Sequence, residues 1–108
     1  MKQYALRMTA AAMEDLEELY SYIATDLGSS RNAYAQTRRI ADTVESLAWM
    51  PERYPPFSFL DLEALKLRRV SVDRYLIFYL VDDNRVTVTD ILCGDSDLPG
   101  QLQERHEG

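Results

Sequence analysis

The sequence is poor in the residues that build disulfides, metal centres and phosphate-binding loops. Its 108 residues include one cysteine, one histidine and four glycines. A single cysteine forms no internal disulfide and no cysteine-rich zinc site. The glycines stand apart at positions 28, 94, 100 and 108, so the sequence holds no glycine-rich phosphate loop. These shortages predict a protein with no metal and no cofactor.

Long hydrophobic runs are also missing. No apolar segment approaches the roughly 20 residues that cross a bilayer, and residues 1–8 alternate polar and apolar side chains where a signal peptide needs an unbroken apolar stretch. Hydrophobic residues still make up 46% of the chain, which is typical of a globular protein. We therefore expect one domain in the reducing cytoplasm, with no membrane partner.

Positive charge is absent from one segment and concentrated in another. Residues 9–27 hold five acidic side chains and no Lys or Arg, whereas residues 66–81 hold four basic side chains and one acidic one. The net charge of −6 argues against binding nucleic acid through its phosphates, so we expect no direct nucleic-acid binding by the chain alone. Two explanations of the asymmetry stay open. Either the acidic and the basic segments are simply exposed to solvent, or the basic segment forms a patch that binds an acidic partner or a phosphate.

Apolar periodicity predicts a strand followed by two helices. Residues 3–8 alternate as in a half-buried strand. Thr9 is a good N-cap, and apolar residues then recur at spacings of three and four until Gly28, which is a typical helix terminator. Ser29 or Ser30 caps a second helix that ends at Pro51. Because the link is so short, the helices must form an antiparallel hairpin.

The second half of the chain predicts an irregular loop and three strands. The loop covers residues 51–65, and its aromatics, Phe57 and Phe59, are expected to pin it to the core. Strands follow at 66–72, 75–82 and 85–93, with a tight turn at 82–84. The predicted fold is α+β: an N-terminal strand and a two-helix hairpin packed on one face of an antiparallel four-stranded sheet, with the other face partly open.

The prediction divides the chain into a domain at 1–97 and a polar C-terminal tail at 98–108. The tail frays unless Leu98 and Leu102 dock. The predicted core consists of residues on the helix stripes and the central strand, namely Leu16, Ile23, Ile40, Val44, Ile77 and Tyr79.

The sequence contains no standard catalytic signature. His106 stands alone in the polar tail and is expected at the surface, and Cys93 is expected as a small buried residue at a strand end. Glu14 and Glu18 have helical spacing and are expected on a solvated helix face. The remaining candidates are arginines and tyrosines of the strand region, namely Arg68, Arg69, Arg74, Arg85, Tyr75 and Tyr79. Arginine grips phosphate or carboxylate bidentately, so phosphate binding and ion pairing both stay open for this set.

Four segments together resemble the RelE/ParE toxin family, and its ParE branch in particular. They are the acidic and aromatic helix at 12–24, the Met-Pro-Glu-Arg stretch at 50–53, Leu-Arg-Arg-Val at 67–70, and the apolar strand at 75–81. The resemblance covers residues 4–97. It implies a toxin of a type II toxin–antitoxin pair whose cognate antitoxin wraps the helical hairpin and the sheet groove.

Family members act in two ways, and the end of the chain discriminates between them. RelE-type members cut mRNA on the ribosome, which needs proton transfer and cations on the phosphate. Here Leu76 stands where many nucleases have arginine, and Cys93, Asp95 and Ser96 stand where the family commonly has histidine and basic residues. The resemblance therefore favours a ParE-like toxin that inhibits DNA gyrase by protein binding rather than by catalysis.

Two alternatives to this function remain. One is an mRNA endonuclease with Arg68, Arg69 and Tyr79 as catalytic candidates. The other is a degenerate toxin that only binds its antitoxin. For contacts with a partner, the candidates are residues of the basic strand region, namely Arg68, Arg69, Arg74, Tyr75 and Arg85.

Overall fold

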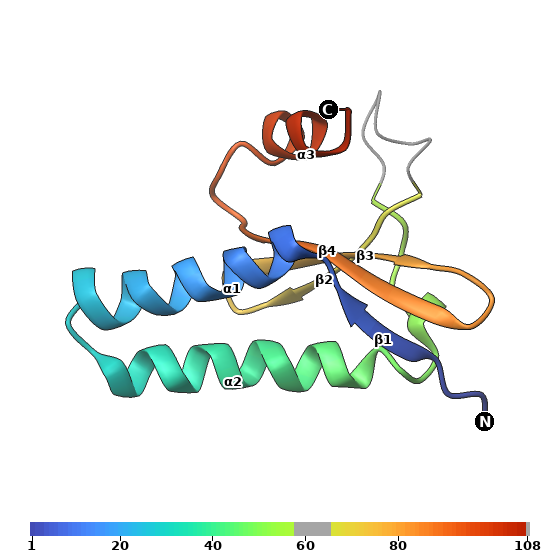
Figure 1. Ribbon diagram of the computed structural model, residues 1–108, viewed down its shortest axis with the longest axis horizontal. Coiled ribbons are helices and arrows are strands. Elements are labelled where there is room, and N and C mark those ends of the chain that lie inside the picture. Colours follow the sequence, from blue (N-terminus) through green and yellow to red (C-terminus); the bar gives the residue numbers. More distant parts are fainter. Residues whose placement is uncertain (58–65, 108) are drawn as a thin grey trace.

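The computed structural model describes residues 1–57 and 66–107 of the chain. Two long helices lie side by side along one side of a small twisted sheet, and a third helix lies on the opposite side (Figure 1). The elements, in order, are β1 (Ala5–Met8), α1 (Ala10–Ser21), the π-helix η1 (Tyr22–Asp26), α2 (Ser30–Ser46), the 3₁₀ helix η2 (Pro51–Arg53), β2 (Arg68–Val72), β3 (Tyr75–Val81), β4 (Arg85–Cys93) and α3 (Leu98–Glu107).

Both helices of the hairpin begin at the caps that the sequence predicts, but α2 ends at Ser46, so the predicted end at Pro51 is wrong. The Thr9 hydroxyl accepts a hydrogen bond from the Ala12 amide, and the Ser29 hydroxyl accepts one from the Asn32 amide, both at 3.1 Å. Gly28 has a φ of 71°, the left-handed conformation in which glycine ends helices without strain. The last turn of the first helix widens into η1, a π-helical turn that the periodicity did not predict.

The sheet has the strand order β1-β4-β3-β2 and is mixed. The β2–β3 and β3–β4 pairs are antiparallel as predicted. However, β1 runs parallel to β4, with Ala5 opposite Arg85 and Met8 opposite Val88, so the prediction of a fully antiparallel sheet is wrong. Alternation of side chains defines the two faces of a strand but says nothing about the direction of its neighbour.

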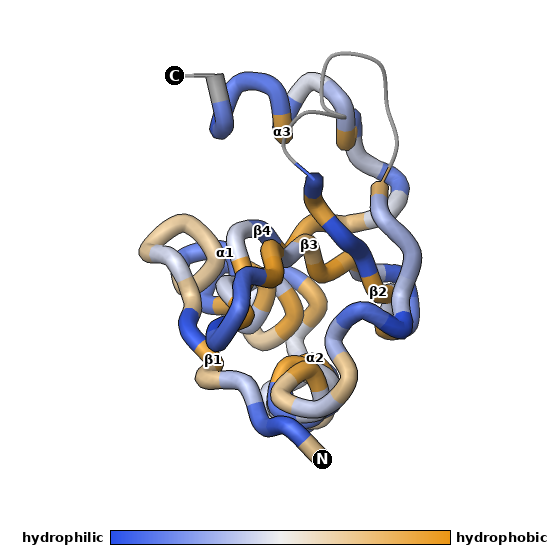
Figure 2. The backbone as a smooth tube through the Cα atoms, turned by 90° about the vertical axis from the view of Figure 1, so that its right-hand side faces the viewer, coloured by the Kyte–Doolittle hydropathy of each residue, from blue (hydrophilic) through white to orange (hydrophobic). Residues whose placement is uncertain are grey.

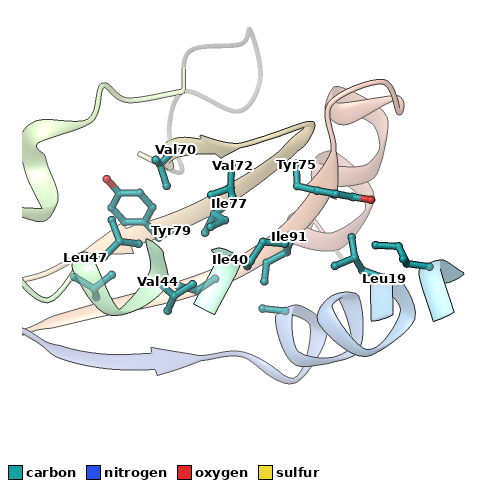
Figure 3. Close-up of a cluster of buried hydrophobic side chains, with 14 of the residues drawn as sticks. Leu19, Ile40, Val44, Leu47, Val70, Val72, Tyr75, Ile77, Tyr79 and Ile91 are labelled. Atoms are coloured by element: carbon teal, nitrogen blue, oxygen red, sulfur yellow. The ribbon is translucent and has the colours of Figure 1, made fainter. Parts of the chain in front are cut away.

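The main core lies between the sheet and the hairpin. Five of the six predicted core residues are buried there, including Ile40, Ile77 and Tyr79 at 0% exposure, and the sixth, Leu16, is half-buried. Figure 3 shows side chains of β2 and β3, such as Val70 and Ile77, facing Ile40 of α2. The amphipathic helix stripes and the apolar central strand thus pack as their patterns predict.

A second, smaller core lies on the other face of the sheet. It is formed by Leu67, Phe78, Leu92 and Leu102, with Phe57 packed edge-on against Phe78 at 5.2 Å between ring centroids. The predicted anchoring role of Phe57 is therefore confirmed, whereas Phe59 lies outside the described residues. Figure 2 shows the apolar segments of β3 and β4 between α2 on one side and α3 on the other.

The C-terminal residues form α3 instead of a frayed tail. Leu102 is fully buried and Leu98 packs beside it, so the docking alternative for these two leucines is confirmed. The sheet face predicted to be partly open is covered here by α3. The prediction of a surface position for His106 is wrong, because its Nε2 lies 2.8 Å from Oδ2 of the buried Asp90. Positions 98, 102, 105 and 106 have helical spacing, and this signal identifies one docking face of α3.

Candidate partner-binding site

A groove lies where the helical hairpin meets the turn between β2 and β3. It has a volume of about 320 Å³ and is lined by Ile23, Leu27, Asn32, Ala35, Gln36, Arg39, Arg74 and Tyr75. Ile23 and Tyr75 are buried and Leu27 is 61% exposed, so an apolar interior opens to solvent. This combination of an apolar interior and a polar rim is typical of sites that bind a peptide segment.

Two arginines stand at the rim of the groove, and each is held by an exposed carboxylate. The Arg39 Nε lies 2.8 Å from Oδ2 of Asp73, which also accepts a hydrogen bond from Gln36 at 2.9 Å. These hydrogen bonds, first from Arg39 and then from Gln36, hold the pKa of Asp73 below its usual value. Arg74 lies 3.3 Å from Asp95, and both side chains are more than half exposed. Exposed pairs of this kind are weak, so both guanidinium groups can exchange their present carboxylates for those of a partner.

Tyr75 connects the groove to the core. Its side chain is only 8% exposed, and burial raises its pKa, so it stays neutral at physiological pH. A neutral phenol in a half-apolar wall contributes contact area and one hydrogen-bonding group without the cost of burying a charge. Of the five predicted partner-binding residues, Arg74 and Tyr75 lie at this groove.

Arg68 and Arg69 lie on β2 and point to opposite faces of the sheet, as neighbours on a strand must. Arg68 donates to the carbonyl oxygens of Tyr54 at 2.7 Å and Glu52 at 3.2 Å, so it braces the chain after η2. The Arg69 guanidinium lies over the Phe57 ring, 5.5 Å from its centroid. Neither arginine lines the groove between hairpin and sheet.

Tyr79, the third catalytic candidate, is built into the core. Its side chain has no exposed surface, and its hydroxyl donates to the Pro51 carbonyl at 2.6 Å. Burial raises its pKa to about 12. A phenol with this pKa does not act as a general base near neutral pH. The three catalytic candidates therefore do not converge on one exposed position.

Arg85 is exposed at the start of β4, opposite Ala5 of β1, and does not line the groove. The structure also supplies three polar groove residues that the sequence analysis missed, namely Asn32, Gln36 and Arg39. Their spacing of four and three residues places them on one polar face of α2, and that face was a usable signal.

Residues 1–57 and 66–107 bring together no group of three His, Cys, Asp or Glu side chains suited to a metal ion. Within the same ranges, every helix is too short or too polar to cross a membrane. Cys93 is half-buried at the end of β4.

The fold resembles that of a solved structure. A chain of the chromosomal ParDE TA system from P. aeruginosa superimposes with a TM-score of 0.70 and 16% identity, covering 84% of this chain and 96% of that chain. At 16% identity, this similarity supports a shared fold and nothing further. No curated protein gives a significant match. The family model described as "ParE toxin of type II toxin-antitoxin system, parDE" matches residues 6–98, and this chain belongs to that family of toxins.

Proposed function

We propose that the chain is a ParE-like toxin that a cognate antitoxin neutralises by occupying the groove between the helical hairpin and the β2–β3 turn. The observation that carries the proposal is the pairing of an apolar interior, Ile23 and Tyr75, with two rim arginines, Arg39 and Arg74, in a chain whose net charge is −6. The segment that fits has apolar side chains for the interior and carboxylates for the rim.

For the cellular target we propose DNA gyrase, inhibited by protein binding. The geometry gives little support to the alternative, ribosome-dependent mRNA cleavage. Cleavage by a 2′-hydroxyl needs a base and several cations around one phosphate. Tyr79 is buried with a raised pKa, Arg68 and Arg69 face opposite sides of the sheet, and Arg74 already meets a carboxylate, Asp95.

The groove is tested by charge reversal at its rim. The chain is co-expressed and purified with the antitoxin encoded beside it, and the melting temperature of the complex is compared with that of the free chain. Saturating antitoxin raises the melting temperature, because a ligand that binds only the folded state stabilises it. We expect Arg39→Glu combined with Arg74→Glu to weaken the complex by at least about tenfold.

The control is Arg38→Glu combined with Arg85→Glu, which makes the same change of charge at two exposed arginines outside the groove. Equal loss of antitoxin binding in both double variants would show that net charge, and not the groove, governs binding. Failure of the wild-type chain to form any complex at micromolar concentration would contradict the toxin assignment.

The target is tested by induced expression in cells. Growth arrest that a resistant gyrase relieves supports the proposal. Discrete mRNA cuts in the ribosomal A site, absent in an Arg68→Ala, Arg69→Ala double variant, would establish the endonuclease instead. Antitoxin binding with neither arrest nor cuts would identify a degenerate toxin.

A further inference from the structure

The closed end of the helical hairpin projects beyond the sheet (Figure 1). Its outward side carries what we name the hairpin-end surface, formed by Glu17, Glu18, Tyr22 and Asp26. Tyr22 is 51% exposed. Tyrosine is enriched at the centres of protein interfaces, where its ring gives contact area at low entropic cost. The Tyr22 ring is not part of the core, which is built from other residues of the hairpin.

The carboxylates of this surface are not neutralised within the described chain. Glu17, Glu18 and Asp26 are exposed, and none of them forms a salt bridge with a basic residue of ranges 1–57 and 66–107. In contrast, the neighbouring Asp15 is buried and held by Arg105 at 2.7 Å. Residues 8–30 contain no Lys or Arg, so no neighbour in the sequence offsets the negative potential of this surface.

The acidic and aromatic groups share one hollow. Glu17, Glu18, Ser21, Tyr22, Thr25 and Asp26 line an open depression of about 510 Å³. Part of its wall is η1, the π-helical turn, and such turns are frequent at functional sites because they redirect side chains. The same turn supplies Ile23 to the antitoxin groove and Tyr22 to the hairpin-end surface. Residues of this one turn therefore line both the groove and the acidic hollow.

We propose that the hairpin-end surface is where the toxin contacts its protein target, and that it docks on a Lys- and Arg-rich surface with which that target holds nucleic acid. Such surfaces pair cations with phosphates and stack aromatic or arginine side chains on bases. Carboxylates and tyrosine rings offer the same two interactions, ion pairing and cation–π contact. This inference rests on the proposed function and adds to it the surface and the chemistry of target recognition.

The test measures binding of the full chain to purified gyrase holoenzyme at low and at high salt. The charge-removal variant is Glu17→Gln, Glu18→Gln, Asp26→Asn, and a second variant is Tyr22→Ala. The matched control removes three exposed carboxylates elsewhere, Glu45→Gln, Asp83→Asn and Glu104→Gln, and so has the same net charge. Antitoxin affinity reports whether each variant is folded and keeps its groove.

We expect both hairpin-end variants to lose about tenfold or more in gyrase affinity at low salt while antitoxin affinity is unchanged. The loss in the charge variant shrinks at high salt, because screening shortens the reach of exposed charges to about 10 Å at 0.1 M. Linear duplex DNA competes with the wild-type chain for gyrase. Hairpin-end variants that bind as tightly as the control, or binding that DNA does not compete, would overturn the inference and leave the proposed function intact.

Growth arrest separates the remaining outcomes. If the wild-type chain arrests growth without binding gyrase, gyrase is the wrong target. In that case, the proposed role of the hairpin-end surface is supported if only the hairpin-end variants fail to arrest growth. It is overturned if these variants still arrest growth. If the wild-type chain arrests nothing, the proposed function and the inference both fail.

Discussion

Tyr79 has a structural role in the main core. Its ring packs in the main core, and its hydroxyl donates to the carbonyl of Pro51, the first residue of η2. The hydrogen bond ties the segment after the hairpin to β3. A buried polar group with a partner is stable, whereas the same group without one is costly.

We expect Tyr79→Phe to destabilise the fold by about 1–3 kcal/mol, because the buried Pro51 carbonyl loses its donor. The substitution also changes the response to alkali. The pKa of Tyr79 is about 12 in the folded state and near 10 when unfolded, so between these values the unfolded state binds fewer protons. Stability therefore falls as pH rises from 10 to 12. Urea unfolding across this range measures the slope, which should be shallower in Tyr79→Phe; an identical slope would contradict the assignment.

Asp15 lies in the acidic run of α1 but has a different role from its neighbours. It is buried, and its carboxylate accepts hydrogen bonds from the Ile91 amide at 2.9 Å and from Arg105. Glu14 and Glu18 are exposed, as predicted. In the helix, position 15 falls between the buried Ala12 and Leu19, so helical periodicity separates it from the solvated acids.

The helix α3 is held to the fold by side-chain contacts with residues that are distant in the sequence. Its Arg105 bridges two carboxylates, Asp15 of α1 at 2.7 Å and Asp90 of β4 at 3.1 Å. Both carboxylates are nearly inaccessible, while Arg105 is 31% exposed. Without the guanidinium, two negative charges would remain buried with only His106 and hydrogen-bond donors beside them.

We expect Arg105→Ala to destabilise the chain by about 3–5 kcal/mol, since removing one partner of a buried ion pair leaves the other uncompensated. The matched control is Arg38→Ala, which breaks the exposed pair between Arg38 and Asp42 within α2 and should cost no more than about 0.5 kcal/mol. Urea unfolding measures both values. Similar values for the two variants would mean that α3 is not held by this cluster.

For the molecule as one unit, the important fact is that both cores share the central strands. Phe78 and Leu92 face α3, while Ile77 and Ile91 face the hairpin. Loss of either α3 or the hairpin would expose one face of β3 and β4 and would weaken the packing on their other face. The same architecture leaves the acidic hairpin end outside both cores, so its charge costs the fold little.

We therefore expect heat to unfold the chain in one cooperative transition that includes α3. A chain truncated after Asp97, which tests the predicted 1–97 boundary, should lose the cover of Phe78 and Leu92 and the partner of Asp15 and Asp90. Its melting temperature should fall by more than about 10 °C, given 4–8 °C per kcal/mol for a domain of this size. A truncated chain that melts like the full one would support the tail as a separate, dispensable segment.

Sequence by itself determined the features that depend on near neighbours. The hairpin is specified by the caps at Thr9 and Ser29, by Gly28 and by the apolar stripes. Hydrogen bonds within one turn decide where helices begin and end. Alternation specified the strands and most of the core. The family resemblance likewise rested on the order of these local elements.

Only the tertiary structure decided what distant residues do together. Three features have no local signature in the sequence. The strand β1 runs parallel to β4, Arg105 pairs with Asp15 across 90 residues of sequence, and Arg39 and Arg74 line the same groove. Burial of apolar surface brings the layers together, and only then do charges find partners or remain without them. The groove is a product of that packing, because it joins side chains of η1, α2 and β3 that lie far apart in the sequence.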